Sequence, residues 1–217
     1  MTYEFREEIF SVSGYQYPIT IPEDYDHDIY IWQGYSGWGV GMWGYKWKKI
    51  NWDSKEALNI ISRFLKNFIG LYNYNKVANI YIPAKLSMIE QNTIHGDGYI
   101  CLNLFLNKMY SVFPVISRVR NLGHDGTGIN CGLLKNDIYA QQEIYSGEFG
   151  NCKMPFDLQP QKEINDALFL HFKSPLKAKV KTIIKIALLI GGFWPFRFSF
   201  NNKIDSLSKF FKSKQII

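Results

Sequence analysis

The stretch DGYICLNLFLNKMYSVFPVISRV, from Asp97 to Val119, contains two different hydrophobic periods. Its first part predicts a helix that begins at Asp97 and runs to Tyr110, because four apolar side chains recur at helical spacing: Cys101, Leu104, Phe105 and Met109. Its second part, Ser111–Val119, alternates as a strand does. A helix followed directly by a strand is typical of the α/β class.

The residues before this stretch predict further elements of both kinds. Short strands are expected at Ile9–Ser13, Ile19–Ile21 and Asp28–Trp32. Asp53 or Ser54 can cap a helix in which apolar residues recur at Leu58, Ile61, Leu65 and Phe68. Leu71–Gln91 is expected to continue helically, with Pro83 breaking the helix. Lys135–Gln161 shows only weak patterning.

Composition limits the class of protein. The chain has 217 residues, of which 47% are hydrophobic and 20% charged, so it can bury a core as one folded unit. Its three cysteines form no CxxC pair, which argues against a disulfide framework and a structural zinc site. The first residues carry three glutamates and do not resemble a signal peptide. We therefore expect a cytoplasmic protein.

Positive charge gathers at the C-terminal end. Residues 171–217 hold ten basic residues and one acidic residue, whereas residues 1–170 hold 15 basic and 18 acidic residues. Because the charge is confined to one end, we expect no nucleic-acid partner. Within this end, Ile186–Phe196 is an uncharged run of 11 residues that is too short to span a membrane. It fits either a segment lying on an anionic membrane surface or a terminal helix packed on the domain.

A tryptophan-rich segment, Ser36–Trp52, has four tryptophans in seventeen residues. An exposed tryptophan face stacks on a sugar ring, so Trp38 and Trp43 are candidate carbohydrate contacts. The alternative is that these side chains anchor the core.

A glycine-rich segment, Asn121–Cys131, has three glycines that let backbone amides approach an anion closely. His124 and Asp125 add titratable groups to it and are candidate substrate contacts. An ordinary surface turn has the same composition.

An acidic run, Asp24, Asp26 and Asp28, includes a DxD match. Such carboxylates can hold a divalent cation that binds the diphosphate of a nucleotide-sugar. Matches this short also arise by chance, so no residue of the chain is assigned as a metal ligand. The sequence lacks the motifs of a serine hydrolase, a zinc protease, a Walker loop and a dinucleotide-binding fold.

Five segments of the chain carry glycine, aromatic and acidic motifs in a fixed order. They are FSVSGYQYP (Phe10–Pro18), IPEDY (Ile21–Tyr25), GWGVGMWGYKWKKINWD (Gly37–Asp53), GDGYICLNLFLN (Gly96–Asn107) and FPVISRVRNLGHDGTGINC (Phe113–Cys131). This order resembles the C-terminal half of bacterial family 2 glycosyltransferases, which are GT-A-fold enzymes of capsule, O-antigen and lipopolysaccharide synthesis. The resemblance covers well over half of the chain, and the number of motifs makes it specific.

The resemblance implies a partial GT-A-like mixed sheet flanked by helices in residues 1–135. Residues 136–217 then form a basic, aromatic and partly helical extension. In the family, a nucleotide-binding half with a DxD-type motif precedes the SGY segment, and here the sequence begins just before SGY. The resemblance therefore implies an acceptor-side half, with a second copy or a separate donor-binding half as partner.

By the same resemblance, Asp97 lies where an acidic residue deprotonates the acceptor hydroxyl in an inverting transferase, and a helix N-cap is the alternative. Tyr99 stands where the family has Trp, and it is a candidate substrate contact. Arg118 and Arg120 are candidates to face a diphosphate, or else they lie on the exposed side of a strand. Asn130 stands where the family has a His suited to metal or diphosphate contact.

Sugar transfer from a nucleotide-sugar donor to a surface-polysaccharide or lipid-linked glycan acceptor is the function that the resemblance implies. It further implies Mg²⁺ or Mn²⁺ as cofactor and peripheral attachment to the inner face of the cell membrane. Two alternatives stay open. One is a non-catalytic glycan-binding or scaffold remnant of such an enzyme, and the other is a membrane-surface protein without a sugar ligand.

Overall fold

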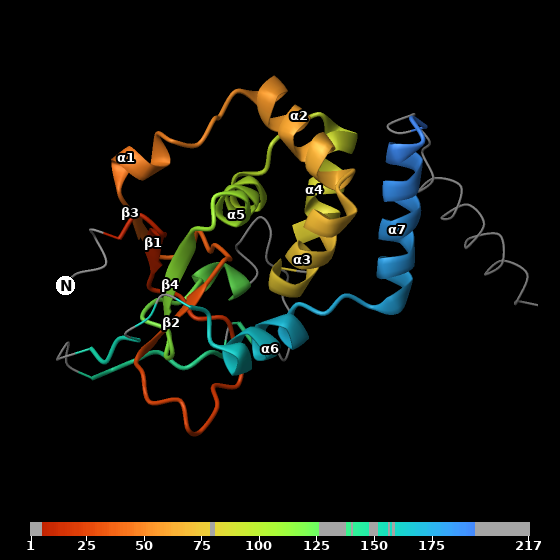
Figure 1. Ribbon diagram of the computed structural model, residues 1–217. Coiled ribbons are helices and arrows are strands. Elements are labelled where there is room, and N and C mark those ends of the chain that lie inside the picture. The colour runs from red at the N-terminus through yellow and green to blue at the C-terminus, as the bar shows by residue number, and fades with distance from the viewer. Residues whose placement is uncertain are drawn as a thin grey trace, which may run out of the picture.

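The computed structural model of the chain describes residues 6–78, 81–125, 138–139, 141–147, 152–155, 157 and 159–193. The strands among them are β1 (Ile9–Ser13), β2 (Ile29–Trp32), β3 (Val40–Met42) and β4 (Tyr110–Pro114). The helices are α1 (Gly44–Trp47), α2 (Ser54–Leu65), α3 (Phe68–Ala78), α4 (Tyr81–Gln91), α5 (Gly96–Leu106), α6 (Lys162–His171) and α7 (Leu176–Ile190), with a 3₁₀ turn, η2, at Leu122–Asp125. Figure 1 shows the helices α2 to α5 gathered beside the sheet, with α7 at the outer edge.

The four strands form one mixed sheet in the order β2-β4-β1-β3. Strands β1 and β4 pair in parallel, whereas β3 and β2 add to them in antiparallel orientation. The Ser11 hydroxyl donates to the Ser111 hydroxyl across the central pair at 2.8 Å, and both side chains are buried. The prediction of an α/β fold is confirmed, and its sheet is mixed.

Two of the three strands predicted before residue 33 are present in the structure, and one is not. Ile9–Ser13 coincides with β1, and the predicted strand ending at Trp32 is β2. The predicted strand Ile19–Ile21 is wrong, because this segment has no ladder partner and the Ile19 N–H instead bonds the Tyr17 carbonyl at 2.7 Å. Prolines stand at both ends of the segment and cannot donate to a sheet.

Helix boundaries follow local capping chemistry. The Asp53 carboxylate accepts the Glu56 N–H at 2.9 Å and caps α2, as predicted. The predicted helical stretch Leu71–Gln91 is divided between α3, which ends at Ala78, and α4, which begins at Tyr81, so the predicted break is confirmed. Pro83 lies in the first turn of α4, where its missing N–H has no helical partner to lose.

The predicted helix from Asp97 to Tyr110 is shorter than expected. It ends at Leu106 in a Schellman motif, in which the Met109 N–H bonds the Leu104 carbonyl at 2.8 Å and the Lys108 N–H bonds the Phe105 carbonyl at 3.3 Å. Lys108 adopts φ +52°, which turns the chain directly into β4 at Tyr110. This cap joins the helix to the central strand with almost no loop.

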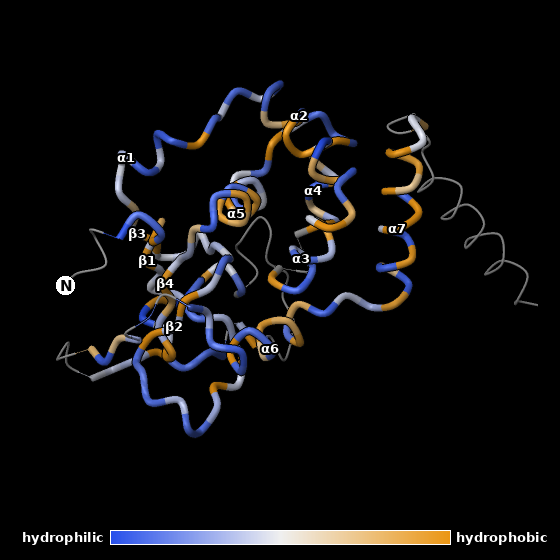
Figure 2. The backbone as a smooth tube through the Cα atoms, in the orientation of Figure 1, coloured by the Kyte–Doolittle hydropathy of each residue, from blue (hydrophilic) through white to orange (hydrophobic). Residues whose placement is uncertain are grey.

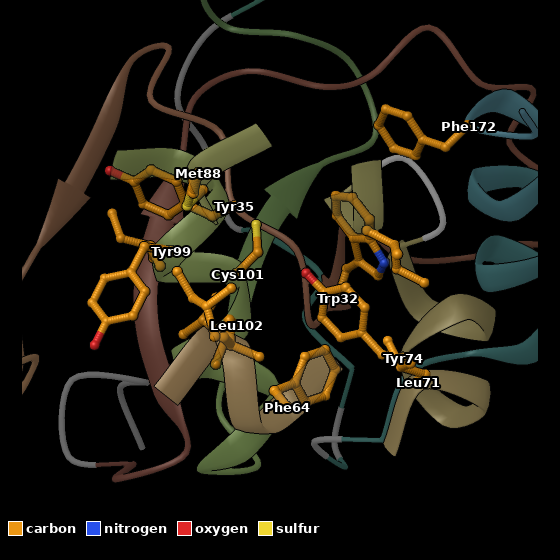
Figure 3. Close-up of a cluster of buried hydrophobic side chains, with 14 of the residues drawn as sticks. Trp32, Tyr35, Phe64, Leu71, Tyr74, Met88, Tyr99, Cys101, Leu102 and Phe172 are labelled. Carbon is orange, nitrogen blue, oxygen red and sulfur yellow. The ribbon is translucent and has the colours of Figure 1, made fainter. Parts of the chain in front are cut away.

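The core is largely aromatic and joins the sheet to the helices (Figure 3). Trp32 of β2 packs edge-to-face on Tyr17 and stacks on Phe172 with ring centroids 5.5 Å apart. Phe172 follows α6, so the extension beyond residue 135 contributes to the same core as β2. The Lys185–Glu90 ion pair, at 2.6 Å, joins α7 to α4.

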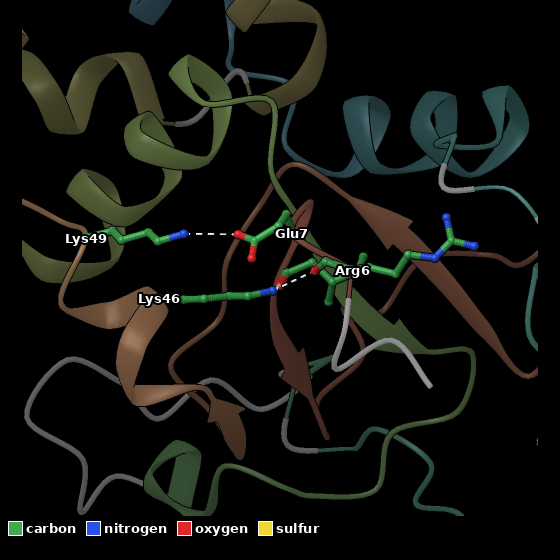
Figure 4. Close-up of polar contacts among 5 residues, drawn as sticks. Arg6, Glu7, Lys46 and Lys49 are labelled. Atoms are coloured by element: carbon green, nitrogen blue, oxygen red, sulfur yellow. Dashed lines mark hydrogen bonds and ion pairs between the residues drawn. The ribbon is translucent and has the colours of Figure 1, made fainter. Parts of the chain in front are cut away.

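A buried lysine fastens the short helix α1 to the start of β1 (Figure 4). The Lys46 ammonium donates to the Arg6 carbonyl at 2.6 Å and to the Ile9 carbonyl, and it lies 4.9 Å from the centre of the Trp43 ring. Burial lowers the pKa of Lys46. By contrast, Lys49 pairs with Glu7 on the exposed surface of the same region.

We expect Lys46→Met to lower the free energy of unfolding by about 1–3 kcal/mol, because two carbonyls lose a donor that water does not replace. Lys49→Met, which removes only a solvent-exposed ion pair, is the matched control and should change stability little. Urea unfolding monitored by circular dichroism measures both. Equal losses in the two variants would show that Lys46 carries no special role.

Candidate functional site

Three segments that are distant in sequence meet in the backbone around Gly14. The Gly14 N–H donates to the Gly39 carbonyl at 2.7 Å, and the Arg118 N–H donates to the Gly14 carbonyl at 2.6 Å. The Gln16 N–H reaches the Ser117 hydroxyl at 3.2 Å. These residues belong to the SGY turn (Ser13–Gln16), the GWG loop (Gly37–Gly39) and the segment after β4 (Val115–Arg120). The three segments therefore form one junction at the end of the sheet.

Close approach at this junction requires glycine. Gly39 adopts φ +58°, a conformation that L side chains rarely adopt. A Cβ at this position would lie 2.7 Å from a methyl carbon of Val119. Glycine at residue 39 therefore allows both the backbone dihedral and the close approach of the GWG loop to the segment after β4.

The GWG loop also lies against Asp97, in the first turn of α5. The Gly37 N–H donates to the Asp97 carboxylate, and a Cβ on Gly37 would lie 3.3 Å from one carboxylate oxygen and 3.4 Å from the other. Absence of a side chain at residue 37 thus leaves the carboxylate in direct contact with backbone. Residues 37 and 97, which belong to different motifs of the sequence, share one site.

The electrostatic environment favours the protonated form of Asp97. The residue as a whole is exposed, yet partial desolvation of its carboxylate raises its pKa, while the Gly37 hydrogen bond works in the opposite direction. The neighbouring Tyr35 is buried, and burial, followed by the nearby Asp97 charge, raises its pKa to about 12. A carboxylate with a raised pKa in contact with solvent is suited to accepting a proton.

Trp38 connects the GWG loop to a cluster of aromatic rings. Its ring meets Tyr15, His124 and Tyr139 edge-to-face, with centroids 4.6, 5.6 and 6.2 Å away. His124 stacks on Tyr139 with centroids 5.3 Å apart, and the Tyr139 hydroxyl lies 3.0 Å from the Nε2 atom of His171. The predicted contacts Trp38 and His124 are therefore neighbours, and the cluster brings α6 to the site.

Both predicted arginine contacts take part in protein interactions. The guanidinium of Arg118 lies 3.4 Å above the Tyr145 ring. Arg120 donates to the Gln142 carbonyl at 2.9 Å, and Gln142 in turn donates to the Gln16 carbonyl. These contacts fasten residues 141–147 across the end of the sheet.

The remaining predicted contacts lie elsewhere. The Tyr99 side chain is fully buried and packs edge-to-face on Trp52 at 5.8 Å, as a core residue does. Trp43 is half-buried beside Lys46 at the opposite end of β3 from the GWG loop. The Asp125 side chain and the whole of Asn130 lie outside the described residues.

The acidic run before β2 is engaged by another segment of the chain. Asp26 pairs with the Lys153 ammonium at 2.8 Å, and the Asp28 carboxylate accepts the Lys153 backbone N–H at 2.7 Å. No group of three or more His, Cys, Asp or Glu residues that could hold a metal ion occurs in the part of the chain that the structure describes. These carboxylates do not fit a divalent-metal site, so no chemical step is assigned to a metal held here.

In comparisons with protein-family profiles, with curated proteins and with solved structures, the chain finds no significant match. Arguments about function therefore rest on the sequence motifs and on the geometry of the site.

A buried lysine beneath the site was not predicted from the sequence. The Lys85 ammonium, on α4, donates to the Tyr74 hydroxyl at 2.6 Å and to the Gly98 carbonyl at 3.1 Å. Gly98 directly follows Asp97, and a Cβ there would lie 2.6 Å from the terminal methyl of Met88. Lys85 thus holds the first turn of α5 against helix α4 through a hydrogen bond. Its position in an apolar helix face between Ile82 and Leu86 is the signal that could have revealed it.

Desolvation lowers the pKa of Lys85 to about 7, whereas an unfolded lysine has a pKa of about 10.4. Between pH 7 and 9 the unfolded chain then binds more protons at this residue than the folded chain, so its contribution to stability rises with pH. Over that range we expect a gain of about 2 kcal/mol, which Lys85→Met removes. Urea unfolding at several pH values measures it.

Lys76→Met, which removes an exposed lysine from the neighbouring helix α3, is the control for loss of a charge. An unchanged pH slope in Lys85→Met would contradict the assigned ionisation.

Proposed function

We propose that this chain provides the acceptor side of a sugar-transfer site, in which Asp97 acts as general base. The donor is a nucleotide-sugar, and the acceptor is a surface-polysaccharide or lipid-linked glycan. A partial GT-A-like architecture belongs to the same proposal.

The contact between Gly37 and the Asp97 carboxylate carries the proposal. The resemblance implied Asp97 as the base, and Trp38, the residue after Gly37, was a candidate sugar contact; sixty positions separate residues 37 and 97 in the chain. A single acceptor site requires these two motifs to lie together, and the contact between Gly37 and Asp97 supports that. The convergence of the SGY turn with the GWG loop and the segment after β4 supports it further, because these are the motifs of the resemblance.

The chemistry of the step is simple. The carboxylate of Asp97 accepts the proton of an acceptor hydroxyl as that oxygen forms a bond to the anomeric carbon of the donor sugar. The bond from the anomeric carbon to the nucleoside diphosphate breaks, and the diphosphate leaves with the electron pair. A raised pKa makes Asp97 a stronger base than an ordinary aspartate, while the Gly37 N–H fixes its orientation.

The residue that follows Gly37 belongs to a cluster of aromatic rings that offers a binding surface for a sugar. Trp38 is partly buried, and it follows Gly37 directly. The rings of His124 and Tyr139 pack against it and hold its plane. In this proposal a pyranose ring lies against the cluster, and one of its hydroxyls reaches Asp97.

We expect Asp97→Asn to reduce sugar transfer by about 10²–10⁴-fold, because asparagine accepts the Gly37 hydrogen bond but not a proton. Transfer is measured with labelled UDP-, GDP- and dTDP-sugars and a panel of glycan acceptors, with and without Mn²⁺. The wild-type rate should rise with pH through an apparent pKa above the ordinary aspartate value.

Asp53→Asn is the matched control, because it also neutralises a carboxylate at the start of a helix and keeps the cap of α2. Because the pKa of Asp97 is higher in the folded chain than in the unfolded chain, the free energy of unfolding falls as pH rises above the unfolded aspartate pKa. Replacing Asp97 by asparagine removes this loss, so Asp97→Asn should not lower stability at neutral pH. Full transfer activity in Asp97→Asn would refute the base assignment. Glycan binding by a chain that transfers no sugar with any donor would favour a non-catalytic remnant.

A further inference from the structure

The outward face of helix α7 is more apolar than its inward face. Only Ile186 and Leu189 of this helix are buried hydrophobic residues. Six larger hydrophobic side chains of the same helix are exposed: Leu176, Val180, Ile183, Ile184, Leu188 and Ile190. Figure 2 shows hydrophobic residues recurring along the whole of α7. A helix that needed only to pack on the domain would have the opposite pattern.

Helix α3 extends this apolar surface across a groove. Phe68 and Tyr72 are 69% and 62% exposed, and they line a groove of about 440 Å³ together with Ile183 and Ala187 of α7. Ile69, which is 77% exposed, adjoins Phe68. We call the exposed hydrophobic residues of α3 and α7 the α3–α7 face. Contiguous apolar surface of this kind marks a site of interaction.

The charges carried by helices α3 and α7 have one sign. The two helices carry five lysines, and neither contains an acidic residue: Lys76, Lys177, Lys179, Lys181 and Lys185. Lys177 and Lys181 are exposed, whereas Lys185 is paired with Glu90. The face therefore suits a partner that is both apolar and negatively charged.

This charge argues against two other occupants. A second copy docked face to face would bring the same lysines of both chains together, and like charges repel. Residues 194–217 hold five basic residues and one acidic residue, so that segment would also add positive charge to the face. An anionic bilayer instead neutralises the lysines and buries the apolar side chains in its interface.

We propose that the α3–α7 face docks the protein on an anionic phospholipid bilayer, with α7 lying in the plane of the interface. No helix among the described residues is long and apolar enough to cross a membrane. This docking surface differs from the run Ile186–Phe196 that the sequence indicated, because it centres on Val180 and Ile183 and includes α3. It is independent of sugar transfer, so the two proposals can fail separately.

The test is co-sedimentation of the full chain with vesicles of phosphatidylcholine alone and of phosphatidylcholine mixed with phosphatidylglycerol. Wild-type protein should bind the mixed vesicles and lose binding as salt is raised. The double variant Val180→Glu/Ile183→Glu should weaken binding at least tenfold, on the order expected when a charge replaces an inserted side chain. Lys177→Gln/Lys181→Gln should weaken binding to the mixed vesicles by about 30-fold.

The control is Leu106→Glu, which places a single glutamate at a site on α5 with the same 48% exposure as Val180 and is compared with the single variant Val180→Glu. It should bind vesicles like the wild type, and circular dichroism should show that all variants are folded. The proposal is overturned by absence of vesicle binding in the wild type, by equal binding to neutral vesicles, or by full binding in Val180→Glu/Ile183→Glu. A concentration-dependent dimer that this variant abolishes, without vesicle binding, would assign the face to a second copy.

Discussion

The hydrogen bonds on the two sides of Gly14 fix the geometry of the site. Its N–H donates to the Gly39 carbonyl, and its carbonyl accepts the Arg118 N–H, so one residue joins the GWG loop to the segment after β4. The loop can approach only because Gly39 has no side chain to strike Val119. Gly37, two residues earlier in the same loop, then reaches the Asp97 carboxylate. The Gly14 junction and the pairing of β3 with β1 together place the GWG loop beside the start of α5.

Features set by short-range chemistry were predictable from the sequence, and features set by distant neighbours were not. The Asp53 cap and strands β1 and β2 depend on a few adjacent residues. Tyr99 was assigned to substrate from its place in a motif, but its helical position points it into the core beside Trp52. The partner that fastens Arg118 lies in residues 141–147, whose sequence has only weak patterning. A contact between remote loops leaves no periodic signal in either loop.

Two lysine side chains, Lys46 and Lys85, are buried in or beside the aromatic core. Lys46 and Lys85 are both fully buried, and each donates to backbone carbonyls at an element end, the start of β1 and the first turn of α5 respectively. Each ammonium also lies against an aromatic ring, which offsets part of the cost of desolvation. A hydrophobic side chain of similar size would avoid that cost but would remove the lysine donor from these carbonyls. The lysines therefore help to specify how these ends are placed.

Helix α4 links the candidate site to the α3–α7 face. On one side Glu90 pairs with Lys185 of α7, and on the other Lys85 and Met88 contact Gly98, next to Asp97. Close packing transmits the orientation of one helix to its neighbour, since packed interiors deform little. A bilayer that holds α7 in its interface would therefore also set the direction in which Asp97 and Trp38 face.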